Sequence, residues 1–300
     1  MTEERKQEIL EIIRNTNRRP AQTGKPLYPE EIMAYPNLCE EIESISRTVD
    51  GFSYRMDILR AKNRGENCPL FINIHGGGFI GPHRENDTYF SAYMADQIHG
   101  ITVDLDYTLS DAAPYPVALH QCMDALDYVA EHANTWGASA KDISVGVYSA
   151  GGALTAAMGI CCAERGGFVP KLQILCYPPL EYRIPDQYKI DAYDRQIGME
   201  RCKAFADLYF DDKKENFEDI HNSPLYAPRE ILAKQPKTLI LSAGLCNFRY
   251  EDEDYAICLA DAGAEVILKR FPEASHGFIP HFMDGWKEAA DLMVREILEK

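Results

Sequence analysis

The sequence has few positive charges. Its 300 residues hold 31 lysines and arginines against 47 aspartates and glutamates, which gives a formal net charge of −16. Nucleic acids and anionic membrane surfaces are bound by basic faces, so this balance argues against both as partners. The acidic runs Asp211-Asp212 and Glu251–Asp254 are interpreted as solvated helix faces, and we expect no metal site in them.

Long apolar runs and paired cysteine motifs are also missing. No segment reaches the length of a membrane-spanning helix, and the N-terminal residues contain no apolar signal-peptide core. The nine cysteines are scattered apart from Cys161-Cys162, and the absence of a C-x-x-C pair argues against zinc or thioredoxin-like chemistry. We therefore expect a cytoplasmic protein with buried, reduced thiols.

Strand-like and helix-like segments alternate along most of the chain. A hairpin is predicted from Ile42–Val49 and Tyr54–Arg60 around Asp50-Gly51. Six further strands are predicted at Leu70–Ile74, Ile101–Leu105, Ile143–Tyr148, Leu172–Cys176, Thr238–Ser242 and Glu265–Phe271. The helices predicted among them are Tyr89–Ile98, Val117–Glu131, Ala153–Glu164, Asp252–Ala262 and Gly285–Leu298. This pattern predicts an α/β fold, with a mostly parallel central sheet of about eight strands and helices on both faces.

Two regions fall outside this alternation. Residues 180–235 are irregular and polar, with one helical segment at Glu200–Phe210, and the first 40 or so residues begin with a helix. The length suits one α/β domain. We expect a single domain over residues 1–300, with a helical cap built from about 1–40 and about 180–235.

The segment Tyr148-Ser149-Ala150-Gly151-Gly152 is the most informative part of the chain. It joins a predicted strand to a predicted helix. A serine on such a turn is typical of a hydrolase nucleophile, because the turn exposes the hydroxyl and points the helix N-terminus at the reacting carbonyl. Val147 stands where the usual G-x-S-x-G pattern has its first glycine, so the turn departs from that pattern at one position.

Two further motifs follow predicted strands. The triplet in His75-Gly76-Gly77-Gly78-Phe79 can aim two backbone amides at a developing oxyanion, with a third amide from Ala150. His276 follows the last predicted strand, at the edge where a parallel sheet binds its ligands. The order serine, acid, histidine is that of the α/β-hydrolases, which favours His276 as a general base.

From about Leu70 to its end, the chain resembles the α/β-hydrolases of the hormone-sensitive lipase-like family (fold-3), which includes many bacterial acetyl and carboxyl esterases. The family's His-Gly-Gly-Gly-aromatic, Tyr-Arg-Leu-Ala-Pro, Asp-Ser-Ala-Gly-Gly, Ser-Pro-Leu and His-Gly-Phe motifs correspond to His75–Phe79, Tyr107–Asp111, Tyr148–Gly152, Ser223–Leu225 and His276–Phe278. The resemblance implies Ser149 as nucleophile, His276 as base, and Gly77, Gly78 and Ala150 as oxyanion donors. It implies no cofactor, and it suggests a homodimer formed through the last strand and helix.

The family's catalytic aspartate is replaced. After Thr238–Ser242 the chain aligns without a gap on the family's Gly-x-Asp-x-Leu pattern, and this places Cys246 at the acid position. A neutral thiol neither fixes the histidine tautomer nor stabilises the imidazolium well. Neutralising the acid of a serine-protease triad costs roughly 10⁴ in turnover.

Several residues could replace the missing acid. Asn247 is adjacent and could orient His276 through its side-chain carbonyl. Glu181 could supply a carboxylate from the neighbouring strand end, and Asp252 or Asp254 could fold back from a helix. The fourth alternative is that nothing replaces it.

Two functions are consistent with these motifs. The first is a serine esterase that hydrolyses small, short-acyl esters through an acyl-enzyme, without a metal or cofactor. The second is a nearly inactive ligand-binding protein on an esterase fold, since fold does not determine function. The serine, the histidine and the glycine loop favour the esterase, and Cys246 favours the alternative.

Overall fold

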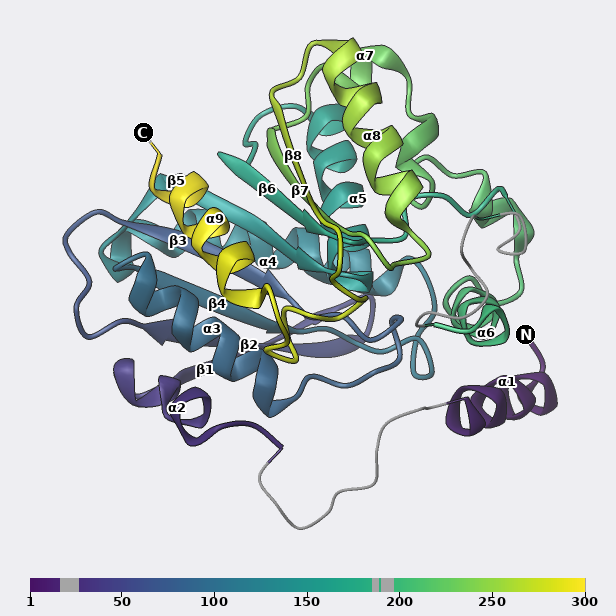
Figure 1. The fold of residues 1–300 in the computed structure, drawn as a ribbon, viewed down its shortest axis with the longest axis horizontal. Helices are drawn as coiled ribbons and strands as arrows, with labels where there is room; N and C mark the ends of the chain where they lie inside the picture. Colours follow the sequence, from purple (N-terminus) through teal and green to yellow (C-terminus); the bar gives the residue numbers. More distant parts are fainter. Residues whose placement is uncertain (17–26, 185–188, 190–196, 300) are drawn as a thin grey trace.

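The computed structural model describes residues 1–16, 27–184, 189 and 197–299 (Figure 1). It contains one sheet with the strand order β1-β2-β4-β3-β5-β6-β7-β8. The strands are β1 (Glu43–Val49), β2 (Phe52–Arg60), β3 (Cys68–Ile74), β4 (Ile101–Asp106), β5 (Ala138–Tyr148), β6 (Leu172–Cys176), β7 (Lys237–Ala243) and β8 (Val266–Phe271). Strand β2 is antiparallel to both β1 and β4, and the other neighbours are parallel, which confirms the predicted sheet.

The hairpin between β1 and β2 has the expected turn. Val49 pairs with Phe52, and the two residues between them, Asp50 and Gly51, have φ values of 53° and 83°. Positive φ at both central residues is the type I′ geometry, whose twist matches that of the flanking strands. The aspartate–glycine pair therefore sets the register of the antiparallel edge.

Helices cover both faces of the sheet (Figure 1). The longer helices are α1 (Glu3–Asn15), α3 (Glu85–Gln97), α4 (Val117–His132), α5 (Ala150–Arg165), α6 (Met199–Tyr209), α8 (Arg249–Ala262) and α9 (Trp286–Leu298). The short ones are α2 (Glu30–Met33), α7 (Arg229–Leu232) and the 3₁₀ helices η1 (Tyr35–Leu38), η2 (Ala133–Trp136), η4 (Lys214–Phe217) and η5 (Pro224–Tyr226). Helices α3 and α9 pack on one face, and α4, α5 and α8 pack on the other.

The core lies in two layers on either side of the sheet. In β3, Phe71 packs with Phe90 of α3 and Met293 of α9. Its neighbour Ile72 packs in the opposite layer, with apolar side chains of α4 and α5. Successive strand residues point to opposite faces, so a strand covered on both sides is a continuous apolar run.

Helix α3 begins earlier than the sequence pattern predicted. It starts at Glu85 rather than Tyr89, because the Asp87 carboxylate accepts a hydrogen bond of 2.9 Å from the backbone N–H of Arg84. This contact satisfies a backbone donor that the helix start would otherwise leave unpaired. The polar first turn carries no apolar periodicity, and for that reason hydrophobic spacing alone missed it.

Helix α1 lies against α6 at the edge of the molecule (Figure 1). Ile9 and Ile13 of α1 are buried and pack with Ala204 and Leu208 of α6. The N-terminal amino group lies 2.7 Å from the carboxylate of Asp211, just beyond α6. Across the ranges described above, no helix is both long enough and apolar enough to cross a membrane.

Ile9 holds α1 in place, and Ile9→Asp should release that helix. The substitution would bury an unpaired carboxylate in an apolar contact, and a small helix should undock rather than accept it. Trypsin should then cleave at Lys6 and Arg14 faster by about 10-fold or more, while the main thermal unfolding transition changes little. Limited proteolysis followed by mass spectrometry measures this. Gln7→Asp adds the same charge on the exposed side of α1, and comparable cleavage of both variants would contradict the prediction.

Candidate active site

Ser149 occupies a strained turn between β5 and α5. Its φ is 54° and its ψ is −124°, and its backbone N–H donates to the carbonyl of Cys176 over 2.9 Å. A Cβ on Gly151 would lie 1.9 Å from the carbonyl oxygen of Ile74, so only glycine allows α5 to start this close to β3. Because the turn also begins the helix, α5 starts at Ala150 rather than at the predicted Ala153.

Val147 fits the turn without disturbing it. Its side chain is fully buried in the apolar layer that contains Phe90 and Met293. The close approach in this strand falls one residue earlier, at Gly146, where a Cβ would lie 2.4 Å from the carbonyl of Ile174. A side chain is therefore tolerated at the position where the usual pattern has glycine.

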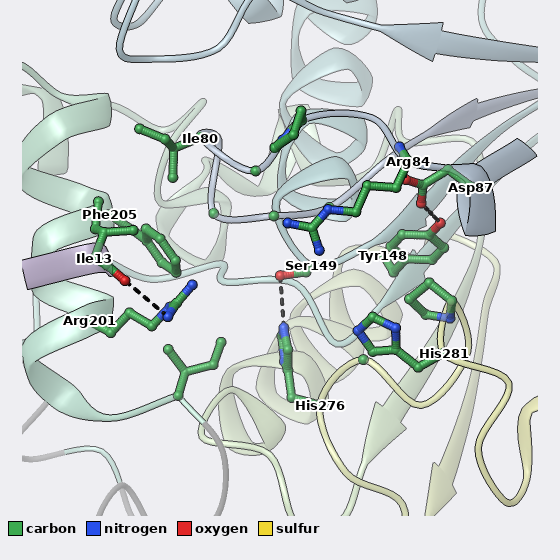
Figure 2. A pocket seen from close by; sticks show the side chains of 18 of the residues that line it. Ile13, Ile80, Arg84, Asp87, Tyr148, Ser149, Arg201, Phe205, His276 and His281 are labelled. Atoms are coloured by element: carbon green, nitrogen blue, oxygen red, sulfur yellow. Dashed lines mark hydrogen bonds between the residues drawn. The ribbon is translucent and has the colours of Figure 1, made fainter. Parts of the chain in front are cut away.

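His276 reaches the serine hydroxyl (Figure 2). Its Nε2 lies 2.8 Å from Oγ of Ser149, and its ring has edge contacts with Tyr177 and Phe248 at centroid distances of 5.0 Å and 5.5 Å. Burial lowers the pKa of His276 to about 3, and the nearby His281 adds to this effect. The imidazole is therefore neutral at neutral pH, so Nε2 can be free to accept a proton.

Cys246 lies on the other side of the histidine ring. Its Sγ is 3.1 Å from Nδ1 of His276 and accepts a hydrogen bond of 3.4 Å from the backbone N–H of Phe248. Burial raises the pKa of the Cys246 thiol well above its usual range. When Nε2 is free, Nδ1 carries the hydrogen and donates to this neutral sulfur. The thiol can orient the ring, but it supplies no negative charge.

The alternative acids make other contacts. The Glu181 carboxylate accepts hydrogen bonds from the backbone N–H groups of Arg183 and Ile184. The Asn247 side chain donates to the carbonyl of Ile197 over 2.8 Å. Asp254 is exposed on α8. Within the described residues, none of these three side chains bonds to His276.

The acidic run at the start of α8 is not a solvated face as predicted, because two of its members are buried. Glu251 accepts a hydrogen bond of 2.7 Å from the backbone N–H of Leu180 and forms an ion pair of 3.0 Å with Lys189. Asp252 is completely buried, and neither of its carboxylate oxygens has a hydrogen-bond partner within the described part of the chain. Burial raises its pKa well above the usual range, which keeps the group neutral.

The glycine loop beside Ser149 presents backbone donors. Gly77 and Gly78 have φ values of 118° and 62°, and a Cβ on Gly78 would lie 2.5 Å from the ring of Phe205. Among the described residues, the N–H groups of Gly77, Gly78 and Ala150 donate to no protein acceptor. The loop is anchored by His75, whose ring stacks on Tyr107 at 4.3 Å.

A buried polar group behind the serine gave no signal in the sequence. Tyr148 donates a hydrogen bond to the Asp87 carboxylate, and both side chains border the cavity above Ser149 (Figure 2). Nearby, Asp104 accepts from Asn73 and contacts His83, each over 2.7 Å. Asp87 has no motif of its own, and only the fold brings it beside residue 148.

Two cavities meet at Ser149. The larger has a volume of about 480 Å³ and is bordered by the glycine loop, His276 and parts of α1 and α6. The smaller has a volume of about 40 Å³ and is mostly apolar, with Phe79, Tyr182, Phe205 and Phe248 among its lining residues. In the regions described, no three histidine, cysteine or acidic side chains are grouped to hold a metal ion.

A parallel sheet with a serine on a strand-to-helix turn, and a histidine reaching it from the loop after the last strand, is an α/β-hydrolase architecture. A family model described as "alpha/beta hydrolase fold" matches residues 71–280. The chain belongs to this family, in the branch that resembles hormone-sensitive lipase.

Relatives in this family carry esterase names. Esterase LipI of Mycobacterium tuberculosis is 29% identical over 217 residues, which cover 71% of this chain and 66% of LipI. Carboxylic ester hydrolase LipN of the same organism is 30% identical over 241 residues, which cover 75% of this chain and 61% of LipN. The chain thus spans under two thirds of the length of these relatives. The crystal structure of carboxyl esterase 2 from the fungus Tuber melanosporum is 21% identical, with a TM-score of 0.81 and 97% of each chain covered, and it shares the fold.

Removing the buried Asp87 carboxylate should change how stability depends on pH. Burial raises the pKa of Asp87 to about 6, so the folded protein holds this proton more tightly than the unfolded chain does. The contribution of Asp87 to stability therefore falls as pH rises from about 4 to about 6. Asp87→Asn should lose this dependence and gain about 1–3 kcal/mol relative to wild type across that window.

Urea unfolding at a series of pH values measures the difference between the two proteins. Glu85→Gln removes an exposed carboxylate from the same helical turn and serves as the control. A constant difference between Asp87→Asn and wild type across this window would show that Asp87 does not titrate there.

Proposed function

We propose that the protein is a serine carboxylic-ester hydrolase that acts on small, short-acyl esters through an acyl-enzyme. The observation that carries this proposal is the 2.8 Å contact between Ser149 Oγ and His276 Nε2. The turn that holds Ser149 is bordered by backbone N–H groups that donate to no acceptor among the described residues. The esterase names of LipI and LipN support the same reaction class.

The proposed reaction uses groups that already lie in contact. Ser149 Oγ attacks the ester carbonyl while His276 Nε2 takes the hydroxyl proton, and the N–H groups of Gly77, Gly78 and Ala150 bind the oxyanion. His276 then gives the proton to the leaving alcohol, which departs and leaves the acyl group on the serine. Water attacks the acyl-enzyme by the same route and releases the acid. No step needs a metal or cofactor.

Cys246 takes the place of the catalytic acid in this scheme. Its sulfur accepts the Nδ1 hydrogen and so holds the ring with Nε2 toward Ser149. Without a negative charge, the thiol does little for the imidazolium that forms when the serine loses its proton. We therefore expect slow turnover compared with a hydrolase that has a carboxylate here.

The cap is proposed to consist of about residues 1–40 and about 180–235, of which 17–26, 185–188 and 190–196 lie outside the described residues. Ile13, Arg14 and Thr16 border the larger cavity from the α1 side, and Ile197, Arg201 and Phe205 border it from the α6 side. These parts lie outside the alternating sheet and close over Ser149. They are therefore proposed to determine which esters enter.

The assembly and the compartment are also proposals. Strand β8 is the edge of the sheet and leaves Leu268 exposed, which suits pairing with a second copy through β8 and α9. The nine cysteines all lie in the described residues and form no disulfide there, and seven of them are buried, which supports a reducing, cytoplasmic environment.

Replacement of the nucleophile tests the function. Ser149→Ala should reduce the rate of 4-nitrophenyl acetate hydrolysis by about 100-fold or more. A complete triad contributes about 10⁶-fold to the rate, and the neutral acid position has already lost about 10⁴-fold of this. The rate of 4-nitrophenol release measures this. Ser144→Ala, which removes a buried hydroxyl from the same strand, is the matched control. Equal rates for wild type and Ser149→Ala would refute the esterase.

The alternative of a nearly inactive ligand-binding protein rests on the neutral Cys246. It predicts ligand binding in the cavity without turnover that depends on Ser149. The nucleophile experiment separates the two functions, because only the esterase loses a measurable rate.

Restoring a carboxylate at the acid position should raise turnover. Cys246→Asp should increase kcat by about 10-fold or more, because an ionised acid stabilises the imidazolium. The acid limb of kcat/KM reports the pKa of the base. In wild type that pKa is about 3, so the rate should stay level from neutral to mildly acidic pH.

In Cys246→Asp the carboxylate raises the pKa of His276, so the limb should move upward toward neutral pH. Steady-state kinetics over a pH series measures both effects. Cys246→Asn has a similar shape without charge and is the control. If the aspartate and asparagine variants have equal kcat values and the same acid limb of kcat/KM, the charge at position 246 has no effect on catalysis.

A further inference from the structure

The larger cavity is basic although the protein as a whole is strongly acidic. Among the described residues, three arginines border it, namely Arg14, Arg84 and Arg201. Within the described part of the chain, the one carboxylate that lines this cavity is Asp87, which is buried and already bonded to Tyr148 and to a backbone N–H. With a formal net charge of −16, this concentration of cations needs a local explanation.

Arg84 is the first of these cations to consider. Its backbone N–H is bound to Asp87 at the start of α3, and its partly buried side chain extends from there toward Ser149 (Figure 2). No described carboxylate forms an ion pair with its guanidinium. A partly buried guanidinium loses hydrogen bonds to water. A planar carboxylate from a ligand would replace them with paired hydrogen bonds.

An arginine and a histidine flank the same space. Arg201 donates to the backbone carbonyl of Ile13 over 3.2 Å and lies over the ring of Phe205, which directs it along the cavity wall. His281 lies on the opposite side, next to His276 (Figure 2). An anion between Arg84 and Arg201 would meet positive charge from two arginines.

The sizes of the two cavities indicate which of them holds the acyl group of an ester and which holds the alcohol. The apolar cavity of about 40 Å³ next to Ala150 has room for only a few atoms, and the lysine that reaches it, Lys189, is paired with Glu251. A short acyl group fits there. The leaving alcohol then occupies the cavity of about 480 Å³, on the side of Arg84.

We propose that the substrates are short-acyl esters whose alcohol part carries a carboxylate, and that Arg84 binds this carboxylate. This inference rests on the proposed esterase function. Ser149 Oγ bonds to the acyl carbon, the bond from that carbon to the alcohol oxygen breaks, and His276 passes the serine proton to the leaving oxygen. Water then cleaves the acyl-enzyme, so the products are a short carboxylic acid and a hydroxy- or phenol-carboxylate.

Paired chromogenic esters test the position of the charge. In the alcohol arm, 4-acetoxy-3-nitrobenzoate is compared with uncharged 2-nitrophenyl acetate. In the acyl arm, mono-4-nitrophenyl adipate is compared with 4-nitrophenyl hexanoate, which has the same chain length. The measured quantity is the ratio of kcat/KM for the charged ester to that for the neutral ester, corrected for their hydroxide-catalysed rates. A general loss of activity cancels in this ratio.

Arg84→Gln should lower the alcohol-arm ratio by about 10- to 100-fold, the effect of losing a charge-assisted contact. Arg84→Lys keeps the charge without the paired geometry and should lower it less. Arg64→Gln removes the same charge from a surface ion pair with Glu40 and should leave the ratio unchanged. A charge preference confined to the acyl arm, or an alcohol-arm ratio that Arg84→Gln does not alter, would overturn the proposal.

Failure of the esterase itself would look different, since wild type would then hydrolyse no ester faster than Ser149→Ala. The carboxylate site can still be tested in that case by calorimetry with 4-hydroxy-3-nitrobenzoate and 2-nitrophenol. Tighter binding of the carboxylate, lost in Arg84→Gln, would support the site. Equal binding of the two compounds would overturn it.

Discussion

The close approach of α5 to β3 is the constraint on which the site depends. Gly151 passes so near the carbonyl of Ile74 that no Cβ fits, and Ser149 must take a positive φ to join the strand to the helix. This strain is offset by the packing of β5 and α5 within a sheet covered on both faces. The same approach brings the N–H of Ala150 and the glycine loop after β3 to one side of the hydroxyl.

The residues that sequence reasoning found share a local cause. Ser149, the glycine loop and His276 each follow directly from the end of a strand, and parallel strands bring their carboxyl ends to one edge. Cys246 could be placed beside His276 because its segment aligns on the family pattern without a gap. In each case a short motif and the topology of the sheet together were sufficient to predict that the residue lies in the site.

The residues that sequence reasoning missed depend on contacts between distant elements. Asp87 matters because Tyr148, 61 positions later, points at it. Burial of Glu251 and Asp252 depends on the strand ends and loops packed over α8, so their charge alone suggested a solvated face. Arg84 looks like an ordinary surface arginine in the sequence, and only the folded loop turns it into the cavity. Charge patterns along a chain do not reveal which charges the fold will bury or expose.

The neutral thiol at position 246 is consistent with its surroundings. Cys246 lies in an apolar layer, and burial there raises the pKa of its thiol well above the usual range. A charged group at this position would lose its solvation, and that loss disfavours the charged form. A cysteine avoids this cost, because it stays neutral and still accepts the Nδ1 hydrogen of His276. The chain thus keeps the orientation of the histidine while giving up the charge that would stabilise its imidazolium. Catalysis therefore relies more on the backbone donors and on the binding of the ester, which gives the cations of the larger cavity greater weight in selecting the substrate.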